Sequence, residues 1–296
     1  MSEYGDAPKV SREESIAEEI RRALGDKDTG RPAAAPGEAR VRVPAYAFAW
    51  AAERASHAGG RLVLHAAEDD RDLEGGFRVV AAFDVGRGGG FLSIETQLDA
   101  AQPRYPSLAA KLPTASWAER EAHDLLGITP EGHPHLAPLV LHDQPAETYP
   151  LRRDFDPRRW PVAPPKPFEA AGVSGGAAAR LTLGPASRAA PARLVFTHDG
   201  EVAVQLEAQL FCLHRGAEKQ AEGLAFEAAL PISERLCAGC AAANAYAFAT
   251  AAERLSGVEA PPRARALRVA TLELERLSSH AQDLFALCAA LGSAAA

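Results

Sequence analysis

The spacing of hydrophobic and polar residues predicts an amphipathic helix near the N-terminus. Ile16 and Ile20 lie four residues apart, which places both side chains on one face of a helix. Ser11 and Glu14 have the spacing of a capping box, a typical helix start. We expect this helix at the periphery of the fold, so that residues 1–35 form an N-terminal helix and a linker.

The next stretch predicts one helix followed by several strands. A helical pattern comes first, and three runs rich in β-branched and aromatic residues follow it, separated by Gly and Asp: 46–60 for the helix, then 61–66, 77–85 and 91–98. One helix before several strands is typical of an α+β domain. We expect that domain to span residues 36–155.

Residues 116–127, "SWAEREAHDLLG", predict a second helix in this domain. Ser116 and Glu119 repeat the capping-box spacing, and Gly127 supplies the glycine that ends many helices. Proline and charged residues then accumulate, and a glycine-rich run follows them. This composition predicts a linker at residues 156–178.

Beyond the linker the pattern predicts short strands and then helices, which we assign to a second domain, residues 179–296. There are three strand-like runs, and the second and third are joined at Asp199-Gly200, the strongest hairpin signal in the chain. From Ser233 onward the pattern is helical, with a stop at Gly257 and a new start at Pro261-Pro262. The last helix carries an apolar stripe at positions 267, 274, 277, 281, 284 and 288.

Charge and composition exclude several classes of function. The 296 residues include 39 acidic and 32 basic ones, a net charge of −7, and the basic residues form no run that would indicate nucleic-acid binding. The chain has no apolar run of the roughly 18 residues that would span a bilayer, and its first residues have no apolar signal segment. We therefore expect a soluble, cytoplasmic protein. Its four cysteines are too few for a disulfide framework.

Two of the four cysteines stand three residues apart in "ERLCAGC", residues 234–240. If Ser233 caps the following helix, Cys237 and Cys240 lie in its opening turns on one face. Two thiolates at this spacing can chelate one metal ion, and the helix N-terminus together with Arg235 would lower the thiol pKa.

The spacing of the two cysteines leaves four interpretations open. Both can be small hydrophobic residues in a core. They can form a zinc site together with Cys212 and Cys288, a dithiol redox motif, or half of a metal site that is completed elsewhere. The chain has no second CxxC to supply the remaining ligands.

One segment, "ASWAEREAHDLLGITPEGHPHLAPLVLHD" with "YPLRRDF" after it, residues 115–155, resembles the 30 kDa subunit of respiratory complex I, an NADH-quinone oxidoreductase. This resemblance implies that the helix and the loop after it dock the domain onto large and small subunits. The residues implied in that interface are Glu119, Arg120, Glu121, Asp124 and His133.

A second segment, residues 183–284, resembles the complex I 49 kDa subunit and the [NiFe]-hydrogenase large subunit. Both families fit the motifs His214-Arg215-Gly216, Glu218-Lys219 and Glu275-Arg276 with Ser279-His280. Only the hydrogenases carry cysteines at the positions of Cys237 and Cys240. Both segments in this order resemble the large subunit of energy-converting group 4 hydrogenases, of the formate hydrogenlyase and hydrogenase-4 type.

This resemblance implies an oxidoreductase component that is incomplete as an isolated chain. Cys237 and Cys240 would be half of a nickel–iron site, with a second CxxC on another segment or chain. Glu218 would be a proton-relay acid and Arg215 its electrostatic partner, while His214 and His280 would lie at contacts between subunits.

The same resemblance implies the partners of the chain and its fold. The partners would be a hydrogenase small subunit, subunits that carry Fe–S clusters, and antiporter-like integral membrane subunits. These would hold the chain on the inner face of the cell membrane. The expected fold is a complex I 30 kDa-like α+β domain followed by the β-hairpin and helical-bundle start of a hydrogenase large subunit.

The sequence departs from the hydrogenase pattern at several positions. Ala238 and Gly239 stand in the reverse of the usual order after the first cysteine, and Asn244 and Ser187 replace family histidines. Asn244 can form hydrogen bonds but cannot exchange protons near neutral pH. The alternative is therefore a non-catalytic scaffold or assembly module of a complex I-like NADH-quinone oxidoreductase that binds no nickel.

Overall fold

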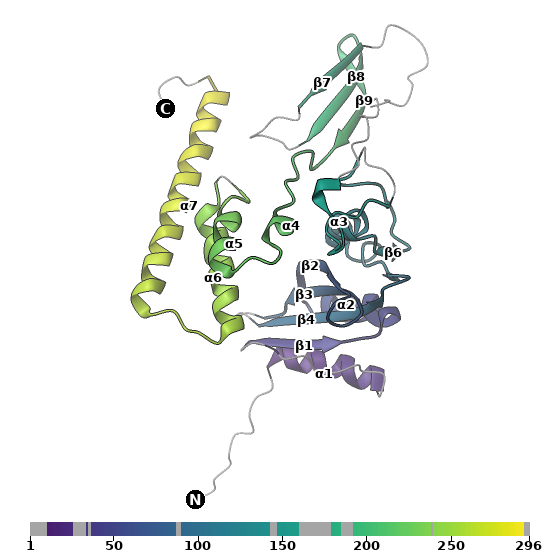
Figure 1. Ribbon diagram of the computed structural model, residues 1–296. Coiled ribbons are helices and arrows are strands. Elements are labelled where there is room, and N and C mark those ends of the chain that lie inside the picture. The colour runs from purple at the N-terminus through teal and green to yellow at the C-terminus, as the bar shows by residue number, and fades with distance from the viewer. Residues whose placement is uncertain are drawn as a thin grey trace, which may run out of the picture. The chain divides into compact units, whose positions relative to one another are not determined.

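The computed structural model forms two compact units, Met1–His214 and Arg215–Ala296 (Figure 1). It describes residues 11–25, 34, 37–86, 90–142, 147–159, 179–184, 192–237 and 239–292. Most of the predicted linker, from residue 160 to 178, lies outside the described residues. The predicted domain boundaries around it therefore stay predictions, while the predicted mixture of helices and strands is confirmed.

A four-stranded sheet forms the centre of the first unit. Its strands lie in the order β1 (Glu38–Arg42), β4 (Phe91–Asp99), β3 (Gly76–Asp84) and β2 (Arg61–Asp70). β1 runs parallel to β4, whereas the other neighbours are antiparallel. The three strands predicted after the first α+β helix are confirmed, and β1 was not anticipated.

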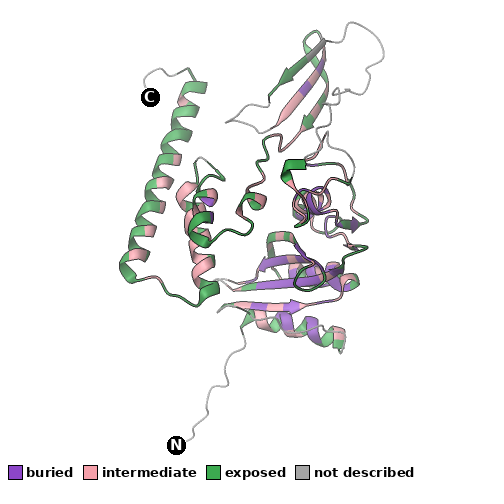
Figure 2. Ribbon diagram, viewed as in Figure 1, coloured by how far each residue is buried: buried purple, intermediate pink, exposed green. Residues whose placement is uncertain are grey.

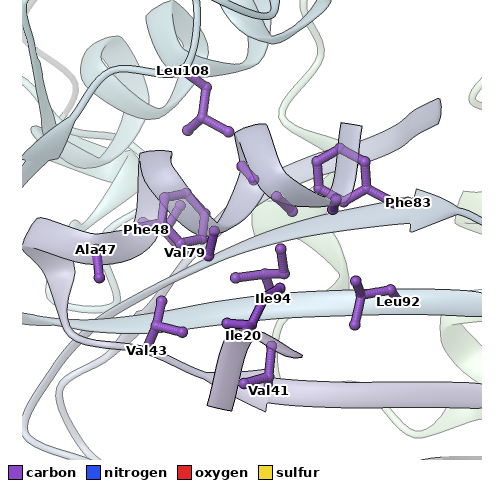
Figure 3. Packing of buried hydrophobic residues seen from close by; sticks show 14 of the residues in the cluster. Ile20, Val41, Val43, Ala47, Phe48, Val79, Phe83, Leu92, Ile94 and Leu108 are labelled. Atoms are coloured by element: carbon purple, nitrogen blue, oxygen red, sulfur yellow. The ribbon is translucent and has the colours of Figure 1, made fainter. Parts of the chain in front are cut away.

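Two helices pack against this sheet and complete its core. α1 (Arg12–Leu24) contacts β1 and β4, and α2 (Phe48–His57), preceded by the short helix η2 (Ala45–Ala47), contacts β3 and β4. Burial in the first unit follows these elements, as the purple segments of the sheet and α1 show (Figure 2). The aliphatic side chain of Ile20 lies among those of Val41, Leu92 and Ile94 (Figure 3).

The first helix begins as the sequence predicts, but it is not peripheral. Ser11 is its N-cap, and the Ser11 hydroxyl oxygen accepts a hydrogen bond from the Glu14 amide at 3.4 Å. Ile16 and Ile20 are buried in the core, with Ile20 at 0% exposure. Arg21 is also buried, and its guanidinium donates to the Arg40 carbonyl of β1 at 2.7 Å. The apolar face of this helix therefore covers the sheet.

The second predicted helix of the domain exists, but its capping box does not. After η3 (Pro113–Ala115), α3 (Ser116–Leu126) begins with Ala115 as its N-cap and with no side-chain cap. Its end is as predicted, because Gly127 has φ +75° and forms a left-handed C-cap. A Cβ at this position would also lie 2.6 Å from the Arg152 guanidinium. Near this helix, β5 (Arg104–Pro106) pairs with β6 (Thr129–Glu131) in parallel.

One buried carboxylate, that of Asp69, fixes the segment that carries "YPLRRDF" to the sheet of the same unit. Both Asp69 oxygens accept from the Arg71 side chain, at 2.8 and 2.6 Å, and one accepts from the Arg153 amide at 2.8 Å. Arg71 also donates to Asp154 at 2.8 Å. The Arg152 guanidinium lies 5.3 Å from the centre of the Phe77 ring. This motif therefore ties the chain before η4 (Pro157–Arg159) to the end of β2.

The predicted strands after the linker form a separate three-stranded antiparallel sheet. β7 (Ala179–Leu183) pairs with β8 (Arg193–Asp199), which pairs with β9 (Val202–Gln209). The turn between β8 and β9 contains Gly200 at φ +66°, a conformation that glycine adopts without strain. The Asp199-Gly200 hairpin is therefore confirmed.

The second unit is entirely helical within the described residues. It contains α4 (Ala217–Ala221), α5 (Phe226–Glu234), α6 (Ala241–Ser256) and α7 (Pro262–Ala290). The helix stop at Gly257 and the helix start at Pro261-Pro262 are confirmed. The hydrogenase large-subunit fold of this region stays a prediction. In the part of the chain that the structure describes, no helix is both long enough and apolar enough to cross a bilayer.

Candidate metal centre

The two paired cysteines lie in the turn between α5 and α6, not in the opening turns of a helix. Ser233 belongs to α5, where its hydroxyl donates to the Leu230 carbonyl at 2.7 Å, so it is not the cap that the sequence suggested. The Cys240 amide donates to the Cys237 carbonyl at 3.2 Å and closes the turn. Gly239 stands inside this turn, and glycine is a poor helix former. α6 therefore begins only after Cys240, which is its N-cap.

The two thiols face each other and are exposed to solvent. Their sulfur atoms are 2.7 Å apart. The hydrogen bond between the thiols lowers the pKa of Cys237 and raises the pKa of Cys240. The amide of Gly239 also lowers the pKa of Cys237, whereas the sequence predicted that the helix N-terminus and Arg235 would lower it. Both residues are exposed, which argues against a core-packing role.

The pair fits part of a metal site. Two sulfurs bound to one tetrahedral ion at about 2.3 Å each would be separated by roughly 3.8 Å. The thiols therefore have to move apart by about 1 Å to bind one ion, which a turn allows more easily than a helix interior. Among the described residues, no His, Cys, Asp or Glu ligand atom joins the two sulfurs in a cluster of three. The pair thus offers two ligands, and the rest of a complete site has to come from elsewhere.

Three side chains of the second unit hold the backbone around the two cysteines. Arg215 donates from its guanidinium to the Leu236 carbonyl at 2.8 Å. Glu275 of α7 accepts from the first amides of α6, those of Ala242 at 2.6 Å and Ala243 at 3.1 Å. Ser279, also of α7, donates from its hydroxyl to the Gly239 carbonyl at 3.4 Å.

The sequence did not assign these anchoring roles. The resemblance implied that Arg215 is an electrostatic partner of Glu218, and no sequence pattern linked Glu275 to the cysteines. One local signal was available, because the first residues of α6 are Ala241, Ala242 and Ala243, none of which can accept a hydrogen bond through its side chain. The sequence alone cannot show which distant residue supplies that acceptor.

Of the other residues implied by the hydrogenase resemblance, His214, Glu218 and His280 are exposed. Glu218 lies on α4, and His280 lies on α7 next to Ser279. The His214 amide donates to the Phe211 carbonyl at 3.2 Å. Asn244 begins the hydrogen-bond ladder of α6 through its amide, which donates to the Cys240 carbonyl at 3.0 Å. Ser187 lies outside the described residues. The catalytic and interface roles of these residues stay predictions.

Glu119, predicted to lie at an interface, is instead buried in the first unit. Its side chain has 0% exposure, and its oxygens accept from the Leu108 amide at 2.7 Å, the Ala109 amide at 3.2 Å and the Ser107 hydroxyl at 2.6 Å. His133 is also enclosed, with Nε2 3.8 Å from a Glu119 oxygen. Because both oxygens of Glu119 accept hydrogen bonds within the chain, the structure gives this carboxylate an internal role, and the interface role that the resemblance implies stays a prediction.

Asp124 also has an internal role, and its interface role stays a prediction. It is buried, and one of its oxygens accepts from the amides of Leu139, Val140 and Leu141 at 2.7, 2.8 and 3.2 Å. Arg120 donates to the carbonyls of residues 137 and 138 at 2.7 and 2.8 Å. These charged side chains therefore fix the loop after β6 onto α3. For Glu121, which is half-buried, the interface role stays a prediction.

Comparisons with known proteins agree with both resemblances. Residues 43–160 match the family model for the respiratory-chain NADH dehydrogenase 30 Kd subunit. Formate hydrogenlyase subunit 5 of Escherichia coli K12 is 33% identical over 239 residues, which are 78% of this chain and 42% of that protein. Hydrogenase-4 component G of the same strain is 31% identical over 241 residues, 79% of this chain and 43% of that protein.

A third relative comes from the other family. The NADH-quinone oxidoreductase C/D subunit of Bdellovibrio bacteriovorus is 35% identical over 179 residues, which are 56% of this chain and 31% of that protein. The chain therefore spans less than half the length of each of these relatives. All three are oxidoreductase subunits by name, as the sequence motifs predicted.

Proposed function

Because residues 43–160 carry a domain of the respiratory-chain NADH dehydrogenase 30 Kd subunit family, and the chain as a whole is similar to hydrogenase subunits, we propose that it is a component of a hydrogenase-type or complex I-type oxidoreductase. The similarity to formate hydrogenlyase subunit 5 extends over 78% of the chain and is not confined to the matched domain. This extent favours a large-subunit role over that of a free-standing 30 Kd subunit.

Within this assembly, Cys237 and Cys240 supply two thiolate ligands of a nickel–iron site. The observation that carries this proposal is the exposed pair of sulfurs, 2.7 Å apart, presented by an anchored turn. Soft thiolate ligands suit nickel and iron, and such a group, when bound, supplies the chemistry of hydrogen and protons. The remaining ligands belong to another segment or chain.

The nearby polar residues then have separate roles. Arg215 donates a hydrogen bond to the Leu236 carbonyl and so fixes the backbone directly before Cys237. Glu218, exposed on α4, is the candidate acid for moving protons to or from solvent. Fe–S clusters of partner subunits would supply the route for electrons. Antiporter-like membrane subunits would hold the assembly, with this chain peripheral on the inner face of the membrane.

The alternative is a non-catalytic scaffold of a complex I-like assembly, in which the thiols bind no nickel. The similarity to the NADH-quinone oxidoreductase C/D subunit supports this alternative. So does Asn244, one turn after Cys240, because an amide cannot exchange protons at the position where the hydrogenase family has a histidine.

Nickel titration of the purified, reduced chain under anaerobic conditions tests the ligand role. We expect a thiolate-to-nickel charge-transfer absorption that Cys237→Ser or Cys240→Ser abolishes. Cys288→Ser is the matched control and should leave the absorption unchanged, because Cys288 lies near the far end of α7. Binding that persists in both serine variants would rule out the half-site.

Two further measurements separate the half-site from its alternatives. As purified, the isolated chain should contain less than one nickel per molecule, because it offers only two of about four ligands. Full occupancy would show that this chain completes the site by itself. In the assembled complex, Cys237→Ser should abolish hydrogenase activity, whereas unchanged activity would favour the scaffold.

A further inference from the structure

Two residues of α7 contact the backbone on both sides of Cys240. Glu275 accepts hydrogen bonds from the amides of Ala242 and Ala243, at 2.6 and 3.1 Å, and Ser279 donates to the carbonyl of Gly239 at 3.4 Å. The two side chains are four residues apart and therefore lie on one face of the helix. They bracket the second cysteine although they are more than thirty positions away in the chain.

The local sequence around Cys240 leaves these backbone groups without a nearby partner. The first amides of a helix have no acceptor within the helix, and an N-cap side chain normally supplies one. Cys240 is the N-cap of α6 and makes no such side-chain bond, since a thiol is a weak acceptor. Glu275 therefore does from α7 what a Ser, Asp or Asn would do at the cap itself.

This arrangement matters because the same turn carries the two thiols. If the first turn of α6 frays, the position of Cys240 relative to Cys237 is no longer fixed. A ligand that needs both sulfurs then binds only the fraction of molecules in which the turn is formed. Preorganisation of two ligands by a supporting side chain is a general requirement of metal sites.

We propose that Glu275 is a positioning residue for metal binding by Cys237 and Cys240, with Ser279 in a supporting role. This inference rests on the ligand role proposed above for the two cysteines. Glu275 does not need to touch the metal, because both of its oxygens already accept hydrogen bonds from α6. Its effect is to hold the start of α6, so that the turn presents both sulfurs to the same ion.

Cadmium titration of the full, reduced chain tests the inference, with the thiolate-to-cadmium charge-transfer band as the readout. Glu275→Ala removes both acceptors and should weaken cadmium binding about tenfold, the size expected for loss of a helix cap. Glu275→Gln keeps one acceptor oxygen but not the charge, and should recover binding to within roughly threefold of the wild type. Glu273→Ala is the matched control on the same helix, where Glu273 is exposed and pairs only locally with Arg276.

Hydrogen exchange separates positioning from general destabilisation. In Glu275→Ala the amides of Ala242 and Ala243 should exchange faster, while the amides in the middle of α7 keep their wild-type rates. If Glu275→Ala does not fold, Glu275→Gln and Ser279→Ala carry the test, with Ser279→Ala weakening cadmium binding roughly threefold. Wild-type affinity in Glu275→Ala would overturn the inference.

The outcomes also distinguish this inference from the proposed function. If Cys237→Ser binds cadmium as well as the wild type does, the two cysteines are not ligands, and both proposals fall. If Cys237→Ser abolishes binding but Glu275→Ala and Ser279→Ala leave it unchanged, the ligand role stands and only the positioning role is wrong.

Discussion

At the residue scale, Asp69 organises the end of β2 and the segment that carries the "LRRDF" motif. Its side chain is almost fully buried, pairs with Arg71 through both oxygens and accepts from the Arg153 amide. Asp69→Ala should destabilise the first unit by about 2–3 kcal/mol, because it leaves the Arg153 amide unsatisfied and removes the buried partner of Arg71.

Urea unfolding followed by tryptophan fluorescence measures this loss, since Trp50 and Trp117 lie on α2 and α3 of the first unit. Asp154→Ala is the matched control. Asp154 also pairs with Arg71, but its side chain is 68% exposed, so the variant should lose less than about 1 kcal/mol. Equal losses in the two variants would contradict the role given to Asp69.

The pH dependence of this site has a definite sign. Hydrogen bonds from Arg71, together with those from the Arg153 and Arg71 amides, outweigh burial and lower the pKa of Asp69 from 3.8 to about 2. A carboxyl group whose pKa is lower in the folded state contributes stability above its unfolded pKa and loses it as the pH falls. The free-energy difference between wild type and Asp69→Asn should therefore be largest above pH 4 and shrink toward pH 2.

Several charged residues show why side-chain roles were hard to predict. Glu119 and Asp124 lie on a helix whose sequence reads as an outer charged face, yet both carboxylates accept from backbone amides of neighbouring loops. A sequence shows the charge but not the unpaired amides that a loop brings close to it. The capping box predicted from Ser116 and Glu119 is absent for the same reason. The Glu119 carboxylate accepts hydrogen bonds from the amides of Leu108 and Ala109 instead of from the start of its own helix.

At the scale of elements, α1 belongs to the core of the first unit. Ile20 has 0% exposure, and Arg21 reaches the Arg40 carbonyl of β1. Ile20→Ala should destabilise the unit by about 3 kcal/mol, as expected for a large-to-small change in a packed core. The same tryptophan-detected unfolding measures it, and exposed Arg22→Ala should stay within about 0.5 kcal/mol of the wild type. An Ile20→Ala variant as stable as Arg22→Ala would show that α1 is peripheral and not part of the core.

Most helices and strands could be predicted from their patterns. The strands β2, β3 and β4 have runs of aliphatic, β-branched and aromatic residues, and Gly257 and Pro262 mark the end of α6 and the start of α7, whereas the start of α6 after Cys240 was not predicted. β1 was missed because it has only five residues, with Ala39 and Val41 as its buried positions. Its place beside β4 depends on a parallel pairing across some fifty residues, which no local pattern contains. The two cysteines could be found from sequence, but their turn and its anchors from α7 could not.

At the scale of the whole chain, the two units differ in how much they bury. The large cluster of buried hydrophobic residues lies within the first unit. In the second unit, α6 and α7 have no buried residue, although α7 is 29 residues long. The predicted apolar stripe of α7 is present but exposed, with Leu274 at 66% and Leu277 at 65%. A helix without tertiary packing gains little stability from its apolar face.

The groove beside α7 has the same apolar character. A cavity of about 470 Å³ lies between α5, α6 and α7, and its walls include Leu230, Tyr246 and Leu267. Exposed apolar surface of this extent usually marks a contact with another segment or protein. We therefore expect this apolar surface to contact another segment or another protein in the assembly.

This expectation predicts how the isolated chain behaves. The wild type should bind a fluorescent dye for apolar surfaces strongly and self-associate as its concentration rises, because the apolar face of α7 is exposed. The double variant Leu274→Glu/Leu277→Glu places two charges on one face of α7 and should reduce both effects while it keeps its helix content. Dye fluorescence and sedimentation velocity measure the two effects.

The matched control is Leu73→Glu, in a turn of the first unit, where Leu73 is 74% exposed and belongs to no helix. That variant should bind the dye and self-associate like the wild type, because a single exposed leucine makes no continuous apolar face. If Leu73→Glu and the double variant behave alike, general surface charge explains the result. The face of α7 would then be an ordinary solvent-facing surface, and the idea that it contacts another segment or protein would have to be abandoned.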